Sequence, residues 1–275
     1  MTLECFASSQ NKVDLPLSKI KRVSKDVLPL ILFLESNFFK KIKVDGASGL
    51  RIYFVENHID EEVQGPFKGF QSWINYYMPF NFTEYFKLEN SHSKKLFLID
   101  KIKEGILNIA NQFNWSRELF LQIFEEIDAL EGMLLTYSKK YRLKGLKAQA
   151  QIEIGCEPGY YQYNLLLLEK DSVISRHHIV TLNAYYNIFF EGNRIISEMK
   201  WEDENTFVIL GKKGELERIR FEYKLDKDKL TRIFTLEPTI VDEFMEEFDL
   251  ATTTDEQKVD IILNNMDTNK WHIYI

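Results

Sequence analysis

The sequence has few cysteines and no long hydrophobic run, and each shortage excludes a class of protein. Its two cysteines, Cys5 and Cys156, lie far apart and outside any CxxC or Cys/His spacing. This excludes a disulfide framework and a structural zinc site. The longest apolar stretch near the start, Val27 to Leu34, contains Pro29 and is far shorter than the roughly 20 residues that span a bilayer. The first 11 residues contain Glu4 and no sustained apolar core, so we expect no secretory signal, no membrane association and a cytoplasmic location.

Sequence motifs of catalysis and nucleotide binding are also missing. No Gly-x-Ser-x-Gly, His-Glu-x-x-His, P-loop or Gly-x-Gly-x-x-Gly string occurs, and the 12 glycines lie mainly in predicted turns. Nucleotide hydrolysis by a known loop type is therefore disfavoured, and we expect no cofactor. The absence of a repeat at a fixed period argues against a solenoid or propeller. Catalysis by dispersed carboxylates stays open, because paired acids need no proximity in the sequence.

What is present is an ordinary globular composition with an uneven charge. The 275 residues are 45% hydrophobic and 28% charged, which predicts one large or two small cores. Residues 1–150 carry 21 Lys and Arg against 18 Asp and Glu, a net +3, whereas residues 151–275 carry 14 against 24, a net −10. Between Glu237 and Asp260, nine acidic residues face only Lys258. Such a segment repels nucleic acid and attracts basic partners.

Two helices are predicted in the first half from apolar residues that recur three and four positions apart. The first stripe is Ile99, Ile102, Ile106, Ile109 and Phe113, and the second is Phe120, Ile123, Ile127, Leu130, Leu134 and Tyr137. Residues 114–116 between them permit only a tight reversal, with Asn114 or Ser116 as the N-cap of the second helix. We expect an antiparallel αα-hairpin over about residues 94–144. A β-hairpin is also expected, in which residues 41–44 and 50–56 flank the turn at 45–49.

The hydrophobic period falls to two after Gly145, which predicts strands. The strand candidates are residues 148–154, 160–168, 173–182, 185–191, 194–201, 206–210, 216–223 and 230–236. Short connectors rich in turn-forming residues predict antiparallel pairing into a meander or partial barrel. Capping-box spacing at Thr239 and Thr254 predicts one or two helices before a closing strand at 271–275. The fold class is therefore α+β, with a mixed half at 1–145 and an acidic, β-rich half at 146–275.

The most unusual local composition lies between Pro66 and Phe86, where nine of 21 residues are aromatic. Those that fit a helical stripe, which Pro79 would end, are Phe67, Phe70, Trp73 and Tyr77. The rings could form the core of the first half, since aromatic side chains bury a large area. They could instead anchor a partner, because Trp and Tyr dominate interface hot spots. Trp73, Tyr76 and Tyr77 are our candidate partner-binding residues in this segment.

Two further clusters of polar residues could carry chemistry. Arg176 and His178 share one row of a predicted strand with Ile174 and Val180. If that row faces inward, His178 could act as an acid or base and Arg176 could hold an anion; otherwise both lie at the surface. The second cluster is His58, Asp60, Glu61 and Glu62. Neighbouring charged residues after a strand are more typical of a solvated turn than of a metal site, so no metal is expected.

A basic cluster ends the predicted second helix: Lys139, Lys140, Arg142, Lys144 and Lys147. It could bind nucleic acid, but Glu118, Glu125 and Glu126 occupy the part of the helix that would read DNA. Cations in a last helical turn also complement the macrodipole, with Gly145 as the C-cap residue.

Taken together, these features predict a protein-binding role in the cytoplasm rather than catalysis. We expect an inhibitor or adaptor of the immunity or antitoxin type that masks a basic partner surface. Its acidic contacts would be Asp242, Glu243, Glu246 and Glu247. The alternative is a hydrolase-like enzyme with a cleft around Arg176 and His178, and the third is nucleic-acid binding through residues 139–147.

Overall fold

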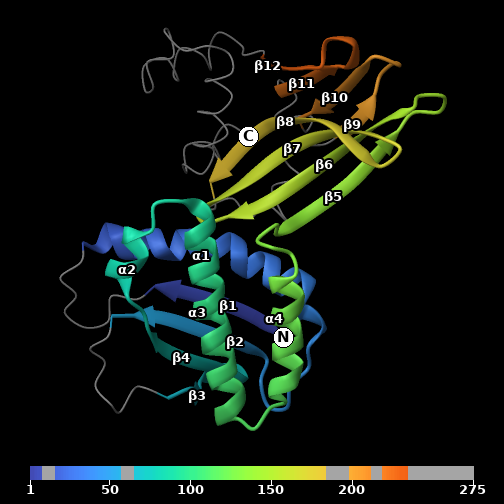
Figure 1. Cartoon of the computed structure of the whole chain (residues 1–275). Helices are drawn as coiled ribbons and strands as arrows, with labels where there is room; N and C mark the ends of the chain where they lie inside the picture. Colours follow the sequence, from blue (N-terminus) through green and yellow to red (C-terminus); the bar gives the residue numbers. More distant parts are fainter. Residues whose placement is uncertain (8–15, 57–64, 184–197, 212–218, 235–275) are drawn as a thin grey trace. The chain divides into compact units, whose positions relative to one another are not determined.

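The computed structural model describes residues 1–7, 16–56, 65–183, 198–211 and 219–234 (Figure 1). Two compact units divide the chain. The first comprises Met1–Thr136 and Gly155–Tyr161, and the second comprises Tyr137–Ile154 and the described residues from Gln162 onward. Helices and strands are both present, with one mixed and two antiparallel sheets, which confirms the α+β class. The predicted terminal helices and closing strand lie outside the described residues.

The first unit is built on a mixed four-stranded sheet in the order β1-β2-β4-β3. Its strands are β1 (Thr2–Ala7), β2 (Gly49–Val55), β3 (Phe67–Lys68) and β4 (Trp73–Pro79). β2 pairs parallel with both β1 and β4, and β3 adds an antiparallel edge. The predicted β-hairpin at 41–56 is therefore wrong: its second arm is the central parallel strand, and its first arm begins in the short 3-10 helix η1 (Phe39–Lys41). Pairing with β1 across an intervening helix is nonlocal and left no turn signal.

Four α-helices occur among the described residues of the first unit: α1 (Leu17–Asn37), α2 (Phe82–Lys87), α3 (Ser91–Gln112) and α4 (Arg117–Asp128). α2, α3 and α4 begin at side-chain caps, where Asn81, Asn90 and Ser116 each accept a hydrogen bond from a backbone N–H of the first turn. Ser116 is thus the N-cap of α4, and Asn114 adopts a left-handed conformation in the reversal. None of the helices in the described part of the chain is both long and apolar enough to cross a membrane.

The predicted helical hairpin is present, but it is shorter than expected. Both apolar stripes are buried within the helices, from Ile99 to Ile109 in α3 and from Phe120 to Ile127 in α4. α4 ends at Asp128 because Glu131 and Gly132 adopt positive φ angles of 49° and 79°, which a helix cannot continue. The expectation of a helix reaching about residue 144 is therefore wrong.

One face of the mixed sheet packs against helices. Alternate residues of the strands are buried: Leu3, Cys5, Leu50, Ile52, Phe54, Ile74, Tyr76 and Met78. Gly105 lets α3 approach closely, since a Cβ there would come within 2.9 Å of Ile52. Asn108 of α3 also donates to the Tyr76 hydroxyl at 3.2 Å. The residues that alternate with these point to the other face, where all but Gly49 and Val55 of β2 stay at least partly accessible.

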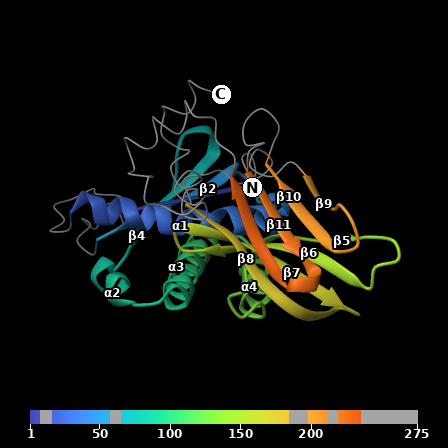
Figure 2. The same cartoon turned by 90° about the horizontal axis from the view of Figure 1, so that it is seen from above.

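In the second unit, the described residues form two antiparallel four-stranded meanders. One sheet contains β5 (Leu135–Arg142), β6 (Ala148–Glu157), β7 (Tyr160–Glu169) and β8 (Ser172–Asn183). The other contains β9 (Glu198–Trp201), β10 (Thr206–Leu210), β11 (Ile219–Lys224) and β12 (Lys229–Phe234). The sheets pack on each other (Figure 2): Trp201 donates to the Tyr141 carbonyl at 3.2 Å, and the rings of Tyr141 and Phe207 lie 5.7 Å apart. The predicted antiparallel pairing is confirmed, but the described strands form two sheets instead of one and no closed barrel.

The turn between β6 and β7 belongs to the first unit. Glu157 accepts hydrogen bonds from Ser91 at 2.6 Å and from Lys95 at 2.5 Å. The Lys95 side chain, only 5% exposed, also donates to the Gly132 carbonyl at 2.9 Å. Polar groups on α3 therefore fasten this turn to the helical hairpin.

Candidate functional site

The aromatic segment forms strands and not the predicted helix. β3, the short 3-10 helix η3 (Phe70–Ser72) and β4 span residues 67–79, and β4 pairs with β2 along its whole length. The helical interpretation is therefore wrong, because short aromatic runs fit both periods and the parallel partner strand decided between them. Pro79 ends a strand.

Strand alternation divides the aromatic residues between the core and the surface. Tyr76, Phe80, Phe82 and Tyr85 are buried. Phe67, Phe70, Trp73 and Tyr77 are on the open face or beside it. Of our three candidate residues here, Trp73 and Tyr77 thus lie on the accessible face and Tyr76 lies on the opposite one. Both readings of the segment, core and surface, therefore apply, each to a different set of rings.

A row of stacked rings crosses the open face of the sheet. Phe6, Tyr53 and Tyr77 are register neighbours on β1, β2 and β4, and Phe67 of β3 extends the row. Successive ring centroids lie 6.0, 4.7 and 6.0 Å apart. The planes of Tyr53 and Tyr77 differ by only 13°, and coplanar rings cannot come so close. The two rings therefore stand face to face and present their edges to solvent.

Trp73 is held in a second row, at the start of the strands. It lies opposite Gly49 in the register, and a Cβ on that glycine would come within 2.7 Å of the indole. The Arg51 guanidinium carbon lies 4.5 Å from the ring centroid. Arg51 Nε donates to Glu4 at 2.6 Å, and this bond is the main cause that raises the pKa of Arg51. Trp73 therefore has little freedom to move.

Polar side chains lie between the two aromatic rows. Glu4, Arg51 and Asn75 are register neighbours on β1, β2 and β4. Asn75 packs on Gly69, where a Cβ would collide with Asn75 Nδ2. Within the described residues, the Asn75 amide makes no hydrogen bond. The space between the rows therefore has a polar floor, on which the Asn75 amide is available for hydrogen bonds.

A strained turn places Phe70 beside this floor. Gln71 and Ser72 have φ angles of 54° and 60°, each unfavourable by about 1–3 kcal/mol for such residues. Ser48 holds the turn by donating from its backbone N to the Ser72 carbonyl at 2.9 Å and from Oγ to the Gln71 carbonyl at 2.7 Å. The Phe70 side chain is left 84% exposed. Strain of this kind is concentrated at functional sites.

These features enclose a half-open groove of about 410 Å³, a volume typical of binding sites. We call it the aromatic groove, and its lining consists of Arg51, Tyr53, Phe67, Gly69, Phe70, Gln71, Trp73, Asn75 and Tyr77. Tyr77 and Trp73 are four residues apart on β4, so their Cα atoms are separated by about 13 Å. The groove is wide enough for one extended chain.

The structure places Arg176 and His178 at the surface of β8. The Arg176 side chain is 56% exposed and lies 3.6 Å from Glu153. His178 contacts Arg232 at 3.1 Å. Ile174, in the same row, is 54% exposed, so this part of the row faces solvent instead of lining an apolar interior.

His177, on the opposite side of β8, contacts Asp228, which lies between β11 and β12. Its Nε2 lies 2.8 Å from Asp228 Oδ1, which also accepts from the Tyr223 hydroxyl at 2.8 Å. The pKa of Asp228 is lowered by Tyr223 first, then by His177 and Ser175. Burial, with Asp228, raises the pKa of Tyr223 to about 12. This cluster joins the two sheets of the second unit and therefore has a structural role. The contact between His177 and Asp228 could not be predicted, because the two residues lie 51 positions apart in the sequence.

The basic cluster begins on strand β5 and not in a helix, so the macrodipole interpretation is wrong. Lys140 pairs with Asp171 at 2.5 Å, and Arg142 donates to Gln149 at 2.9 Å. Gly145, expected as a helix C-cap, lies between β5 and β6 with φ of 94°. Two of the five cations are therefore already engaged, Lys140 by the turn between β7 and β8 and Arg142 by the neighbouring strand β6.

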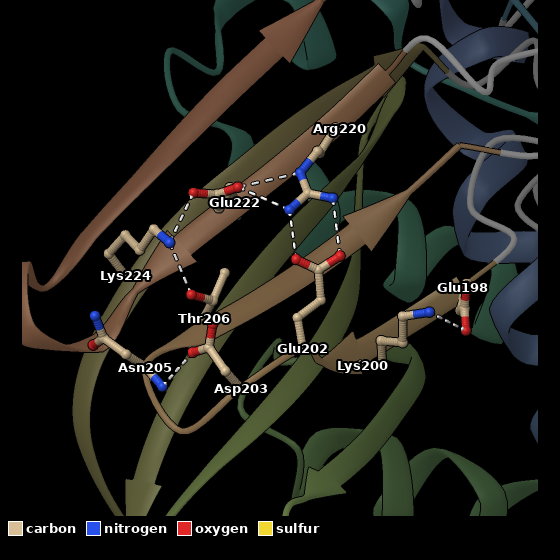
Figure 3. A network of polar contacts seen from close by, with 9 residues as sticks. All are labelled: Glu198, Lys200, Glu202, Asp203, Asn205, Thr206, Arg220, Glu222 and Lys224. Carbon is tan, nitrogen blue, oxygen red and sulfur yellow. Dashed lines mark hydrogen bonds and ion pairs between the residues drawn. The ribbon is translucent and has the colours of Figure 1, made fainter.

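A polar network covers part of the β9–β12 sheet (Figure 3). Arg220 binds Glu202 through both Nη atoms, at 3.0 and 2.7 Å, and Glu222 at 2.9 Å. Lys224 bridges Glu222 and Thr206. These bonds raise the pKa of Arg220 and lower those of Glu202 and Glu222. Because its charges compensate one another, the network is better suited to holding strands together than to binding.

Other predicted residues lie outside the described part of the chain. They are His58, Asp60, Glu61 and Glu62, and the acidic residues Asp242, Glu243, Glu246 and Glu247. Across the described ranges, no three His, Cys, Asp or Glu side chains come together as a metal-binding group would require.

Comparisons of the chain with protein-family models, curated proteins and solved structures found no match.

Proposed function

We propose that this protein is a protein-binding module that docks its partner on the aromatic groove. The observation that carries the proposal is the accessible aromatic face of a sheet whose three main strands are parallel. Such sheets are normally covered on both faces. Here one face packs on helices, and the other presents rings fixed in position by stacking.

The residue types of the groove support a protein partner. Trp, Tyr and Arg are the residues most enriched in interface hot spots, and Trp73, Tyr53, Tyr77 and Arg51 all line the groove. Because neighbouring rings and Gly49 already restrict these side chains, their ordering would contribute little unfavourable entropy on binding.

Nucleic acid is less well suited to this face. Bases stack on free ring faces beside cations that neutralise phosphates. Both faces of Tyr77 are occupied, by Tyr53 and Phe67, and Arg51 is already paired with Glu4. The groove thus lacks the surfaces that base stacking uses.

The wider role expected from the sequence remains part of the proposal. An inhibitor or adaptor of the immunity or antitoxin type, in the cytoplasm, would use the groove as one contact. The acidic residues 242–247 would form a second contact with a basic partner. Docking at the groove does not require this second contact.

Site-specific photocrosslinking tests the proposal. A photoreactive amino acid would replace Phe70, or Met133 as the control, an apolar residue of the first unit that is 69% exposed but outside the groove. The protein captured only from position 70 would be purified and its affinity measured for Phe70→Ser, Tyr77→Ser and Met133→Ser. We expect about a tenfold or greater loss for the first two and less than about twofold for Met133→Ser. Equal affinities for all three, or no capture specific to position 70, would overturn the proposal.

A further inference from the structure

We infer that the aromatic groove binds a proline-rich segment of the partner in the polyproline II conformation. The inference rests on the proposed function and adds the chemistry of the occupant. It starts from an imbalance in the groove: because Arg51 carries donors only, the lining side chains have more donor hydrogens than acceptor oxygens.

Donors are supplied at the floor and along one wall. The Asn75 amide has no partner among the described residues, and the Arg51 guanidinium lies beside it in the register. Tyr53 and Tyr77 add hydroxyl groups. The one carboxylate in this register row, Glu4, already accepts from Arg51. An occupant rich in acceptors and poor in donors therefore fits best.

A polyproline II segment has this character. Its proline residues have no backbone N–H, whereas every residue keeps a carbonyl acceptor. Its carbonyls are not used internally, so they are free to bind donors. Pyrrolidine rings pack well against aromatic side chains, here the ring edges of Tyr53 and Tyr77 and the exposed ring of Phe70. The preformed conformation also lowers the entropy lost on binding.

Other peptide conformations fit less well. An added β-strand needs a sheet edge, but the groove crosses the face of the sheet, over β2 and β4. A helix is about 10–12 Å wide and satisfies its own carbonyls, so it would leave Asn75 unpaired. The groove also has no net charge, because Arg51 and Glu4 neutralise each other, and it therefore does not select for a charged peptide.

Anisotropy titrations of the full chain with fluorescent decaproline test the inference. A glycine-serine peptide and a single-stranded RNA of equal length serve as comparison probes. We expect decaproline to bind with a dissociation constant on the order of 100 µM, and the other two probes to bind at least about tenfold more weakly. Asn75→Asp, which replaces the donor with a carboxylate, should weaken decaproline binding about tenfold. Asn111→Asp makes the same change at an exposed position of α3 and should have no effect.

The outcomes separate this inference from the proposed function. Decaproline binding that weakens in Asn75→Asp and Tyr77→Ser, with both variants folded by circular dichroism, supports it. No decaproline binding up to about 2 mM, or binding unchanged by both variants, overturns it. If a partner crosslinks at position 70 while decaproline does not bind, the groove binds protein in another conformation. Preferential binding of the RNA would overturn both proposals.

Discussion

Gly49 lies directly beneath the indole of Trp73, so closely that a Cβ on the glycine would come within 2.7 Å of the ring. Gly49 has no side chain to pack in the strand, and the Trp73 ring occupies the space that a side chain would fill. The pair therefore stabilises the sheet and sets the position of one groove wall.

Replacing Gly49 with alanine should displace Trp73. We expect Gly49→Ala to lower the free energy of unfolding by about 1–3 kcal/mol through overpacking, and to weaken partner binding as well. Gly65→Ala is the matched control, since a Cβ there would meet nothing within 4 Å. Urea unfolding followed by tryptophan fluorescence measures the free energy of unfolding of both variants. Equal stability of the two variants would show that the indole moves aside freely.

Removing Lys95 should destabilise the first unit. Lys95→Met leaves Glu157 and the Gly132 carbonyl without their shared donor, so we expect a loss of about 2–4 kcal/mol in thermal or urea unfolding. Lys101→Met removes a more exposed pair with Glu104 and should change stability by less than about 0.5 kcal/mol. Similar losses in the two variants would contradict the structural role assigned to Lys95.

Asp228 should make stability depend on pH in the acid range. Its folded pKa lies below the ordinary value of 3.8, so its stabilising effect is fully present above that value and is lost as pH falls through the folded pKa. Asp228→Asn should therefore be less stable than the natural protein at pH 7, and the difference should shrink below about pH 4. Asparagine also tolerates the left-handed backbone at this position, where φ is 45°.

Urea unfolding between pH 3 and 7 measures this effect. Glu169→Gln is the control, because Glu169 is exposed and makes no hydrogen bond in the part of the chain that the structure describes. If the difference in free energy of unfolding between Asp228→Asn and the natural protein stays constant down to pH 3, the Asp228 charge has no role in stability.

Both cysteines should be unreactive in the folded protein. Cys5 and Cys156 are buried and not in a disulfide, and burial raises the pKa of the Cys5 thiol well above its ordinary value. Thiol titration with a chromogenic disulfide reagent at pH 7.5 should be slow in the native state and should reach two thiols in denaturant. Rapid native labelling of either thiol would contradict their burial.

Local patterns predicted the elements that depend on local interactions. The stripe from Ile99 to Ile109, the cap at Ser116 and the alternating strand from Ala148 were all visible in the sequence, because each follows from neighbouring residues. The end of α4 was missed because the stripe continues through Leu130 and Leu134, while Gly132 stops the helix.

The groove could not be predicted because it depends on strand pairing over long distances. The spacing of the aromatic residues at 67–77 fits both a helix and a strand. Only the register with β2 shows that Trp73 and Tyr77 share one face of the sheet and that Tyr76 lies on the other. Likewise, the residues around Gly49 contain no signal that the indole of Trp73, 24 positions away, would cover it. The aromatic excess marked the segment but could not say which rings are accessible.

The left-handed turn at Gln71 and Ser72 means that this protein is less stable than its fold allows. Glycine or asparagine at either position would relax the backbone, so a selection for heat resistance alone should enrich those residues there. A glycine there would also free the turn to adopt other backbone conformations, and so loosen the support under Phe70. A descendant stabilised by glycine at these positions should therefore lose the fixed geometry of the groove before it loses any part of its core.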